Sequence, residues 1–385
     1  MKLVVFSHKE VWKSSGALTC YATDGGFAFH MKAVSEIFDE TRIVLPLKAS
    51  ADRKGEVPID GKNITIKTVE NIKGTKLNRK LRYPFWLLKN VFLFVNEILK
   101  ADAVHVPIPS DMGTIPMVLA HLMRKKLFVR HCGNWYVQRT KAEKFWKWSM
   151  ESYAGGRNVF ISTGGGKENP SSKNRNIKWI FSTSMQQVEI DALKGKVHVI
   201  NPDSPRLIIA CRQEEEKGAG RVLDAVSVLK LKYPNIIFDV LGEGGFLKEL
   251  KRRTAEYGLE ENVVFHHKVN HDRVVELMQN SNILCFPTRA SEGFPKVALE
   301  AMACGIPIIA NPVSVIPQLL EGGGGILLEA DDKNTIADAV TKMVENPDLY
   351  LQMQKNAQAT VEKFSLENWR DTIKKYLEES WGKIS

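Results

Sequence analysis

The sequence predicts an α/β protein built from two open parallel sheets, each doubly wound with helices on both faces. Short apolar runs alternate with amphipathic stretches along both halves of the chain, as strands and helices do in such sheets. The segments between them are short, which doubly wound sheets require. The chain has 385 residues, enough for two domains of ordinary size.

The first half opens with the apolar run Leu3–Phe6, which reads as a strand, followed by a loop rich in Ser, Thr and Gly. The next stretch, Phe27–Phe38, has the pattern of an amphipathic helix. Helical stretches then alternate with further strands, which are expected at Arg42–Leu47, Ala103–Pro107 and Leu127–Arg130.

The two halves meet at a cluster of turn-forming residues, Asn201-Pro202-Asp203-Ser204-Pro205. We therefore expect a first domain over residues 1–203 and a second over 204–365. Strands of the second domain are expected at Arg206–Arg212, Ile236–Leu241, Asn262–Phe265, Ile283–Pro287, Pro307–Ala310 and Ile326–Glu329. Its helices are expected at Ala219–Lys232, Phe246–Tyr257, Asp272–Gln279 and Lys296–Ala303, and helices close the chain at Lys333–Glu345, Asp348–Lys363 and Leu366–Ser380.

Composition and charge narrow the function classes. The chain is 44% hydrophobic and 25% charged, which is normal for a globular protein with sizeable cores. Its formal charge of +10 favours an anionic partner, such as nucleotide phosphates, nucleic acid or an acidic membrane face. A solvated basic surface is the alternative.

The five cysteines are scattered without a CxxC pair, which indicates a reducing compartment and no structural zinc. The N-terminus lacks the apolar run and cleavage site of a signal peptide. The most apolar segment, Phe85–Leu99, is shorter than the roughly 20 apolar residues that span a bilayer. We therefore expect a cytoplasmic protein.

The stretch SEGFPKVALEAMACGIPII, Ser291–Ile309, places one glutamate before a predicted helix and a second within it. Pro295 suits the first helical position, so the free amides of Lys296, Val297 and Ala298 would attract a phosphate. Glu292 and Glu300 could then accept hydrogen bonds from hydroxylated groups on either side. A nucleotide sugar has this combination of groups. Alternatively, both glutamates are surface charges around a core helix.

Four further features lie at strand ends or helix starts. Arg212 and Lys217 follow the first strand of the second domain and could hold phosphate oxygens, although charged strand ends are common. The glycines of Leu241-Gly242-Glu243-Gly244-Gly245 permit close approach of a ligand or simply a tight turn. The pair Gly25-Gly26 opens the first helix and could receive phosphate or sugar, without forming a complete dinucleotide-binding motif.

One histidine is a candidate contact with the substrate, and the arrangement of the others argues against a metal site. His131 follows an apolar strand of the first domain, so it is either a structural residue or a hydrogen-bonding partner of the substrate. His266 and His267 would point to opposite faces of a strand, and no carboxylate cluster accompanies them or His271. We therefore expect neither a metal site nor a bound cofactor.

The segment from Arg206 to Leu328 resembles the C-terminal half of retaining glycosyltransferases of the GT-B fold, family four of the sequence-based classification. Glu292-Gly293-Phe294-Pro295 through Glu300, followed by Ala301–Pro307, resembles the E-x7-E signature of that family. Arg212 with Lys217-Gly218 is similar to its diphosphate-binding Arg and Lys, and Gly242-Glu243-Gly244 is similar to its glycine turn. The final helix within 366–385 looks like the one that crosses back to the first domain. Cys211, Lys268 and Cys132-Gly133-Asn134 depart from the usual pattern.

The resemblance implies two Rossmann-like domains that face a central cleft, and metal-independent transfer of a sugar, with retention, from a UDP-, GDP- or other nucleotide sugar. It implies that Glu292 orients the donor sugar and that Glu300 holds the ribose. Arg212 and Lys217 would stabilise the leaving diphosphate, and His131 would bond a hydroxyl of the donor sugar. The remaining donor-binding residues are expected to be Gly25, Gly26, Gly242, Gly244, Val269, Phe294, Pro295, Lys296 and Val297.

The acceptor is expected to be a glycan or a lipid-linked saccharide. Lys73–Lys100 combines basic residues with aromatic and aliphatic ones, and could dock on an anionic membrane such as the inner face of the cytoplasmic membrane. A basic loop before a core helix explains it equally simply. Rival functions are an inverting transferase, a sugar-nucleotide epimerase or, since the chain is basic, a nucleic-acid-binding protein. No nucleic-acid motif is present, so we expect no nucleic-acid partner.

Overall fold

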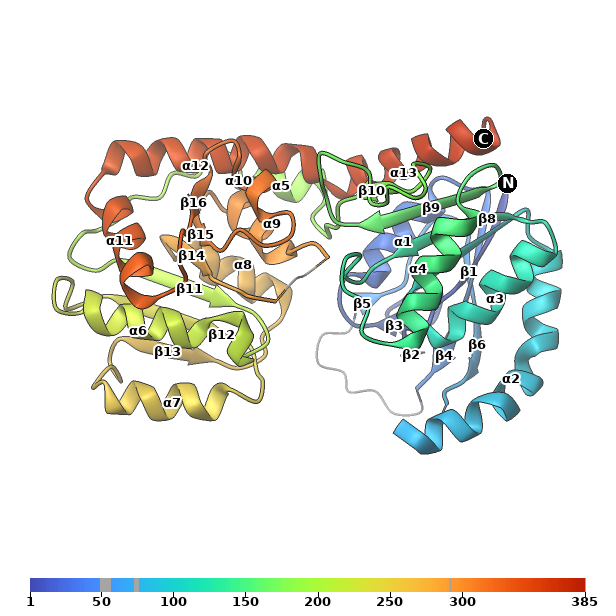
Figure 1. Ribbon diagram of the computed structural model, residues 1–385, viewed down its shortest axis with the longest axis horizontal. Coiled ribbons are helices and arrows are strands. Elements are labelled where there is room, and N and C mark those ends of the chain that lie inside the picture. The colour runs from blue at the N-terminus through green and yellow to red at the C-terminus, as the bar shows by residue number, and fades with distance from the viewer. Residues whose placement is uncertain (49–56, 73–75, 291–292, 385) are drawn as a thin grey trace. The chain divides into compact units, whose positions relative to one another are not determined.

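The computed structural model describes residues 1–48, 57–72, 76–290 and 293–384, and it divides the chain into two compact units (Figure 1). The first unit comprises Met1–Ser184 together with Leu366–Ser385, and the second comprises Met185–Ser365. Glu292, a predicted site residue, lies outside the described residues, as do positions 73–75 of the predicted membrane-docking segment.

The first unit is built on a parallel sheet of seven strands in the order β10-β9-β8-β7-β1-β4-β6. Numbered along the chain, these strands lie in the order 7-6-5-4-1-2-3, so the strand order reverses beside β1, as in dinucleotide-binding folds. The strands are β1 (Lys2–Phe6), β4 (Glu40–Leu47), β6 (Ile64–Glu70), β7 (Ala103–Ile108), β8 (Lys126–His131), β9 (Asn158–Thr163) and β10 (Lys178–Ile180). A small antiparallel sheet of β2 (Trp12–Lys13), β3 (Tyr21–Thr23) and β5 (Val57–Pro58) accompanies it.

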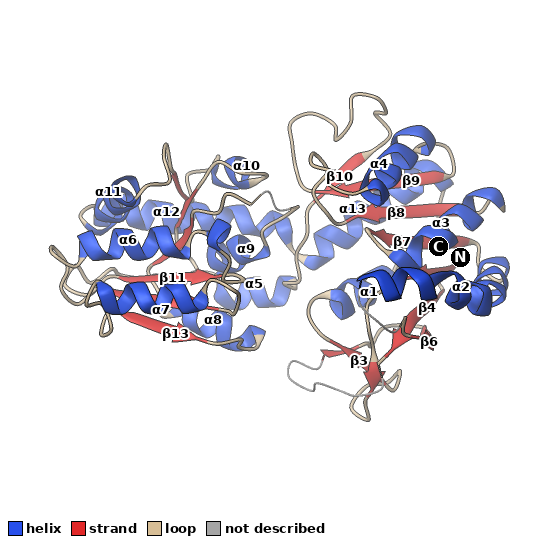
Figure 2. Cartoon of the chain, turned by 60° about the horizontal axis from the view of Figure 1, so that its bottom comes forward, coloured by secondary structure: helices blue, strands red, loops and turns tan. Residues whose placement is uncertain are grey.

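Helices cover both faces of this sheet (Figure 2), because its strands are apolar on both sides. One face packs against α2 (Lys76–Leu99), α3 (Asp111–Leu122) and α4 (Lys141–Tyr153). The other packs against α1 (Phe27–Ser35) and α13 (Leu366–Trp381). Capping defines where α3 and α4 begin: Ser110 accepts a hydrogen bond from the amide of Gly113, and Thr140 forms a capping box with Glu143.

The final helix α13 belongs to the core of the first unit. Trp369 is 1% exposed, and its ring lies 4.6 Å from the ring of His30 and 5.0 Å below the guanidinium of Arg130. The helix contacts α1, β9 and β10. Its apolar face, rather than a linker sequence, therefore ties the end of the chain to the first unit.

The second unit contains a parallel sheet of six strands in the order β13-β12-β11-β14-β15-β16. In chain order this is 3-2-1-4-5-6, the order of the Rossmann fold. The strands are β11 (Arg206–Ala210), β12 (Ile237–Leu241), β13 (Val263–His266), β14 (Ile283–Phe286), β15 (Ile308–Ala310) and β16 (Gly325–Leu327). They coincide with the six predicted strands apart from their ends.

One face of this sheet packs on α6 (Ala219–Leu229), α7 (Leu247–Glu256), α11 (Lys333–Val344) and α12 (Pro347–Val361). The other face contacts α8 (His271–Gln279) and α9 (Lys296–Ala303). The unit also contains the short helices α5 (Gln187–Leu193) and α10 (Ile316–Leu320). The expected α/β fold with two doubly wound sheets is confirmed.

The boundary between the units lies earlier than the expected position after residue 203. The segment after Ser184 bonds to helices of the second unit. The amide of His198 donates to Gln354 Oε1 over 2.9 Å, and His198 Nε2 lies 2.6 Å from the carbonyl oxygen of Cys304. The turn-forming residues 201–205 therefore lie within the second unit, where they lead into β11.

Candidate functional site

The reversal of strand order in the second unit lies between β11 and β14, where ligands of open α/β sheets bind beyond the carboxyl ends of the strands. A pocket of 470 Å³ opens at the ends of β11, β12 and β13. It brings together five of the predicted donor-site residues: Arg212, Gly242, Val269, Val297 and Glu300. Its other lining residues are Ala210, Cys211, Leu241, Glu243, Lys268 and Val274.

The glycine turn after β12 packs directly on the end of β11. The φ of Gly242 is +110°, and a Cβ atom there would overlap the carbonyl oxygen of Cys211. A Cβ at Gly244 would overlap the backbone of Gln213, whose amide donates to the carbonyl of Glu243 over 3.0 Å. Both glycines are therefore required by close backbone packing. Gly242 also lines the pocket. At this position glycine can therefore serve both the tight turn and the close approach of a ligand.

Arg212 is exposed directly after β11 and lines a second pocket of 580 Å³ together with Glu214–Glu216, Arg221 and Arg289. Lys217 closes a short 3₁₀ helix, Glu215–Lys217, and does not line the 470 Å³ pocket. Arg212 thus lies at the junction of two hollows. Its exposed, always-charged guanidinium suits an anionic ligand there.

Glu300 lies within α9, and its side chain is 13% exposed. Burial raises the pKa of this carboxyl group, while His271 and Lys296 oppose the rise. Oε1 of Glu300 lies 3.7 Å from Nδ1 of His271, the first residue of α8. Because α8 follows β13 and α9 follows β14, only the folded sheet brings this carboxylate and this imidazole together.

The start of α9 differs from the expectation by one residue. Pro295 is the N-cap residue rather than the first helical residue, and it gives the first turn no side-chain hydrogen bond. The amide of Ala298 is not free, because it donates to the carbonyl oxygen of Pro295 over 3.1 Å. Lys296 and Val297 begin the helix, and of these Val297 lines the pocket. Phe294, Pro295, Lys296 and Gly244 do not line it.

His266, the last residue of β13, and His267, which follows it, have different surroundings. His266 Nε2 lies 2.8 Å from Oδ1 of Asp239, a fully buried carboxylate that also accepts two hydrogen bonds from Arg206. Nδ1 of His267 lies 3.4 Å from Glu243, beside the pocket. His266 is thus part of a buried polar network that joins β11, β12 and β13. Among the described residues, no three His, Cys, Asp or Glu side chains form a group that could hold a metal ion.

His131, the predicted catalytic residue of the first unit, is the last residue of β8 and is 2% exposed. Burial lowers its pKa to about 4, so the imidazole is neutral at pH 7. Trp135 meets it edge to face with ring centroids 5.4 Å apart. A neutral imidazole can donate one hydrogen bond and accept another, which suits a sugar hydroxyl.

The glycine pair Gly25-Gly26 also belongs to the first unit. Gly25 has a φ of +66°, and Gly26 is the N-cap of α1 without a side-chain hydrogen bond to the helix. A positive φ favours glycine at position 25. Gly25, Gly26 and His131 are therefore placed on a different unit from the 470 Å³ pocket.

The sequence analysis does not predict Lys268 and Val274 as pocket residues, nor His271 as the neighbour of Glu300. His271 was considered only as a metal ligand, and Lys268 only as a departure from the usual glycine. The signal that could have found them is position: residues that directly follow β13 reach the same sheet edge as those that follow β11 and β12.

Comparison with known proteins identifies a family that part of this chain resembles. The family described as "Glycosyl transferases group 1" matches residues 192–360. An uncharacterized glycosyltransferase of Haemophilus influenzae is 32% identical over 153 residues, which is 39% of this chain and 42% of that protein. A GDP-mannose-dependent alpha-(1-6)-phosphatidylinositol monomannoside mannosyltransferase of Mycolicibacterium smegmatis is 26% identical over 152 residues, 38% of this chain and 40% of that protein. The chain thus matches less than half the length of these relatives.

Solved structures resemble the whole chain. HepE of Anabaena, crystallised with UDP, has a TM-score of 0.69 at 15% identity and covers 98% of this chain and 100% of its own. WaaG, a glycosyltransferase of lipopolysaccharide biosynthesis, has a TM-score of 0.61 at 12% identity and covers 99% and 100%. The fold is thus the GT-B fold of two Rossmann-like units, as the resemblance implied. Residues 192–360, which lie within the second unit, thus resemble the glycosyl transferases group 1 family.

Proposed function

We propose that this protein transfers a sugar from a nucleotide-diphosphate sugar to a glycan or a lipid-linked saccharide. The observation that carries the proposal is the 470 Å³ pocket at the carboxyl ends of β11, β12 and β13, within the family-matched domain. It combines a cation, a glycine turn and a largely buried carboxylate, provided by Arg212, Gly242 and Glu300. A nucleotide sugar offers a matching diphosphate and hydroxyl groups.

The donor would bind with its diphosphate at Arg212 and the start of α9. The side chains of Val269, Val274 and Val297 give the pocket apolar walls for the nucleoside. Glu300 would accept hydrogen bonds from the ribose hydroxyls, which replace the water that burial removes from its carboxylate. Arg212, Lys217 and the first amides of α9 would stabilise the charge on the departing diphosphate without a metal ion.

On the first unit, we propose that neutral His131 bonds a hydroxyl of the donor sugar near the reacting carbon. Glu292 would orient the same sugar, and the transfer would proceed with retention at the anomeric carbon. HepE was crystallised with UDP and glucose, and the Mycolicibacterium relative is named for GDP-mannose and a phosphatidylinositol-linked acceptor. These names support a nucleotide-sugar donor and an acceptor on a lipid or glycan for this chain.

We also propose peripheral association with an anionic membrane through α2. Trp86, Phe94 and Ile98 of this helix pack on the core, as a core helix requires. Its opposite side exposes an apolar stripe at helical spacing, in which each side chain is at least 60% exposed: Leu81, Phe85, Leu88, Phe92 and Leu99. Exposed Arg82 and Lys100 accompany the stripe. An apolar stripe flanked by basic residues is typical of helices that lie in the membrane interface. No helix in the described parts of the chain is both long and apolar enough to cross a bilayer.

The test of the donor proposal is a panel of sugar nucleotides scored for thermal stabilisation and for donor hydrolysis. A true donor at 100 times its Kd should stabilise the fold by about 2.7 kcal/mol. Arg212→Ala should weaken its binding roughly 10- to 100-fold, since it removes charge-assisted hydrogen bonds. The control is Arg252→Ala on α7, because the guanidinium of Arg252 pairs with Glu249 and Glu256 of the same helix.

Catalytic roles are tested separately from binding. His131→Ala and Glu292→Ala should each lower turnover by about 10²-fold or more while donor affinity changes little, if they act on the reacting sugar. The anomeric configuration of the product distinguishes retention from inversion, and turnover in EDTA tests metal independence. Wild-type donor affinity in Arg212→Ala would contradict the donor-site assignment.

A further inference from the structure

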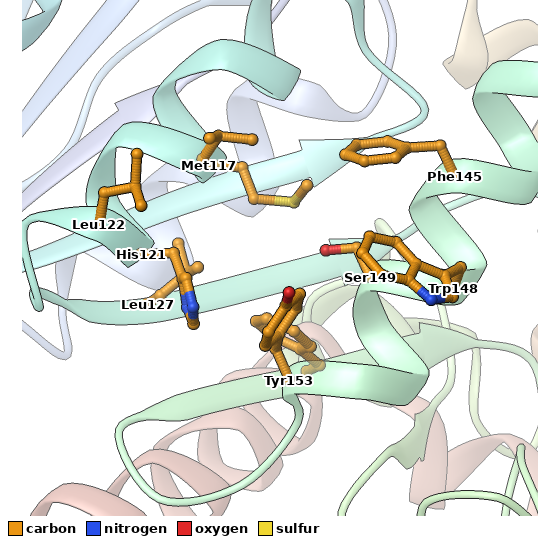
Figure 3. A pocket seen from close by; sticks show the side chains of 10 residues that line it. Met117, His121, Leu122, Leu127, Phe145, Trp148, Ser149 and Tyr153 are labelled. Atoms are coloured by element: carbon orange, nitrogen blue, oxygen red, sulfur yellow. The ribbon is translucent and has the colours of Figure 1, made fainter.

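A third pocket, of 200 Å³, lies in the first unit between α3 and α4 (Figure 3). Its floor is formed by residues of β8 and β9, and its walls by side chains of the two helices, among them Met117, Leu122 and Trp148. The walls are almost entirely apolar. Neither the donor site nor the proposed reaction uses this pocket.

The pocket opens to solvent through an apolar rim. Leu122 is 70% exposed, Trp148 52% and Tyr153 41%. The rings form a continuous series, with Trp148 5.8 Å from Phe145 and 5.8 Å from Tyr153, and Tyr153 4.5 Å from His121. Aromatic rings with a polar edge favour the boundary between an apolar phase and water. The composition of this rim therefore fits a lipid surface better than bulk water.

Positive charge lies at the end of the pocket where α3 terminates. Arg157 donates a hydrogen bond through Nη2 to the carbonyl oxygen of His121 over 3.3 Å, and its residue is exposed. Arg124 is exposed in the turn that follows α3. Lys125, next in that turn, donates to the carbonyl oxygens of Leu99 and Ala101 at the end of α2. The two arginines do not line the pocket, but they lie beside His121 and Leu122, which do. An apolar hollow with arginines beside one end matches a phospholipid, whose acyl chain is apolar and whose headgroup carries a phosphate.

The exposed stripe of α2 belongs to the helix that packs beside α3, one wall of the pocket. Helices α2, α3 and α4 all cover the same face of the sheet (Figure 2), and α2 contacts α3. Lys125 links the turn after α3 to Leu99, the last exposed apolar residue of α2. A membrane that binds the exposed stripe of α2 would therefore also contact the rim of the pocket, because α2, α3 and α4 form one layer of helices.

The pocket lies toward the amino ends of the strands, whereas the proposed reaction site lies at their carboxyl ends. Leu127, which lines it, is the second residue of β8, whereas His131 is the last. They are four residue steps apart along the strand, which is about 13 Å. A chain held in the pocket would thus anchor the protein and would not present an acceptor hydroxyl to His131.

We propose that this pocket binds one acyl chain of an anionic membrane phospholipid, whose headgroup phosphate lies against Arg124 and Arg157. The proposal rests on the membrane association proposed above and deepens it. The rim then inserts into the bilayer to a shallow depth, at which one acyl chain moves out of the bilayer and into the pocket. Binding is specific for a chain with an anionic headgroup and is saturable, unlike general adsorption of a basic surface.

The test uses the full chain and dihexanoyl phosphatidylglycerol below its micelle concentration, with binding followed by calorimetry. We expect saturable binding of one lipid per protein. Val118→Trp fills the pocket with an apolar side chain and should weaken binding about tenfold or more. Leu122→Glu, at a more exposed position, should do the same. Leu231→Glu, whose leucine is 87% exposed in the second unit, is the matched control and should bind as the wild type does.

Replacing both arginines, as in Arg124→Gln with Arg157→Gln, should weaken binding of the anionic lipid but leave that of dihexanoyl phosphatidylcholine unchanged. Thermal unfolding and sugar-nucleotide stabilisation of each variant are measured in parallel, so failure of this site is distinguished from failure of the donor site. Wild-type protein without saturable lipid binding, or Val118→Trp with wild-type affinity, would overturn the proposal. So would a dimer that Leu122→Glu dissociates, because a second copy would then cover the rim.

Discussion

The glycine turn at the donor pocket offers a prediction whose size follows from the structure. In Gly242→Ala the new Cβ would overlap the carbonyl oxygen of Cys211, which is backbone at the end of β11 and cannot rotate away. The φ of +110° adds a conformational cost of about 1–2 kcal/mol for an L-residue. Overpacking against a fixed group costs about 1–3 kcal/mol more. We therefore expect a loss of about 2–5 kcal/mol in the free energy of unfolding.

The chain provides a matched control for the conformational part of this cost. Gly258 has a φ of +62°, and a Cβ there meets nothing within 4 Å. Gly258→Ala should lose only about 1–2 kcal/mol. The difference between the variants therefore reports the contact with Cys211 together with the less favourable φ of Gly242. Urea unfolding followed by far-ultraviolet circular dichroism measures it, because all eight tryptophans lie in the first unit and do not report on the second directly.

The same substitution should affect the donor site. Displacement of Cys211 moves the neighbouring Arg212, and a shift of about 1 Å in a positioning group can cost up to 10²-fold. Gly242→Ala should therefore weaken sugar-nucleotide binding, whereas Gly258→Ala should not. If the two variants unfold at the same urea concentration and bind the donor equally, the close contact between the glycine turn and β11 does not position the site.

Three further predictions concern single side chains. Glu300→Gln should weaken donor binding roughly 10-fold or more, because a charged hydrogen-bond acceptor is lost. In the wild type, donor binding should strengthen as the pH rises through the raised pKa of Glu300, because the carboxylate forms there. Calorimetry across pH should show that the variant lacks this dependence. The same raised pKa means that the Glu300 contribution to stability falls as pH rises from the unfolded pKa to the folded one. Asp239→Asn should cost about 3–5 kcal/mol in urea unfolding, because it leaves Arg206 without its buried carboxylate partner, and a near-neutral result would contradict the importance of that network. Trp369→Ala should cost about 3–5 kcal/mol and lower the unfolding temperature reported by tryptophan fluorescence, and an unchanged temperature would show that α13 is not part of the first core.

The sequence predicted the second unit more completely than the first. Its strands β11 to β14 are short apolar runs between turn formers, so periodicity and punctuation agree there. In the first unit, β6 and β9 were not predicted. β6 lies at the edge of the sheet and buries only Ile64 and Val69. β9, NVFIST, is entirely buried although half of its residues are polar. The polar side chains of β9 can be buried only because neighbouring strands and side chains of the folded unit surround them.

The sequence by itself determined the α/β class, the strands that carry the pocket, and the residue types at their ends, since these depend on local apolar runs, glycines and charges. Tertiary structure alone decided that Glu300 meets His271, that Gly242 lies against Cys211, and that α3 and α4 leave an apolar hollow between them. Each of these contacts joins segments from different strands or helices. Strand order sets such distances, and no local pattern in a single segment encodes it.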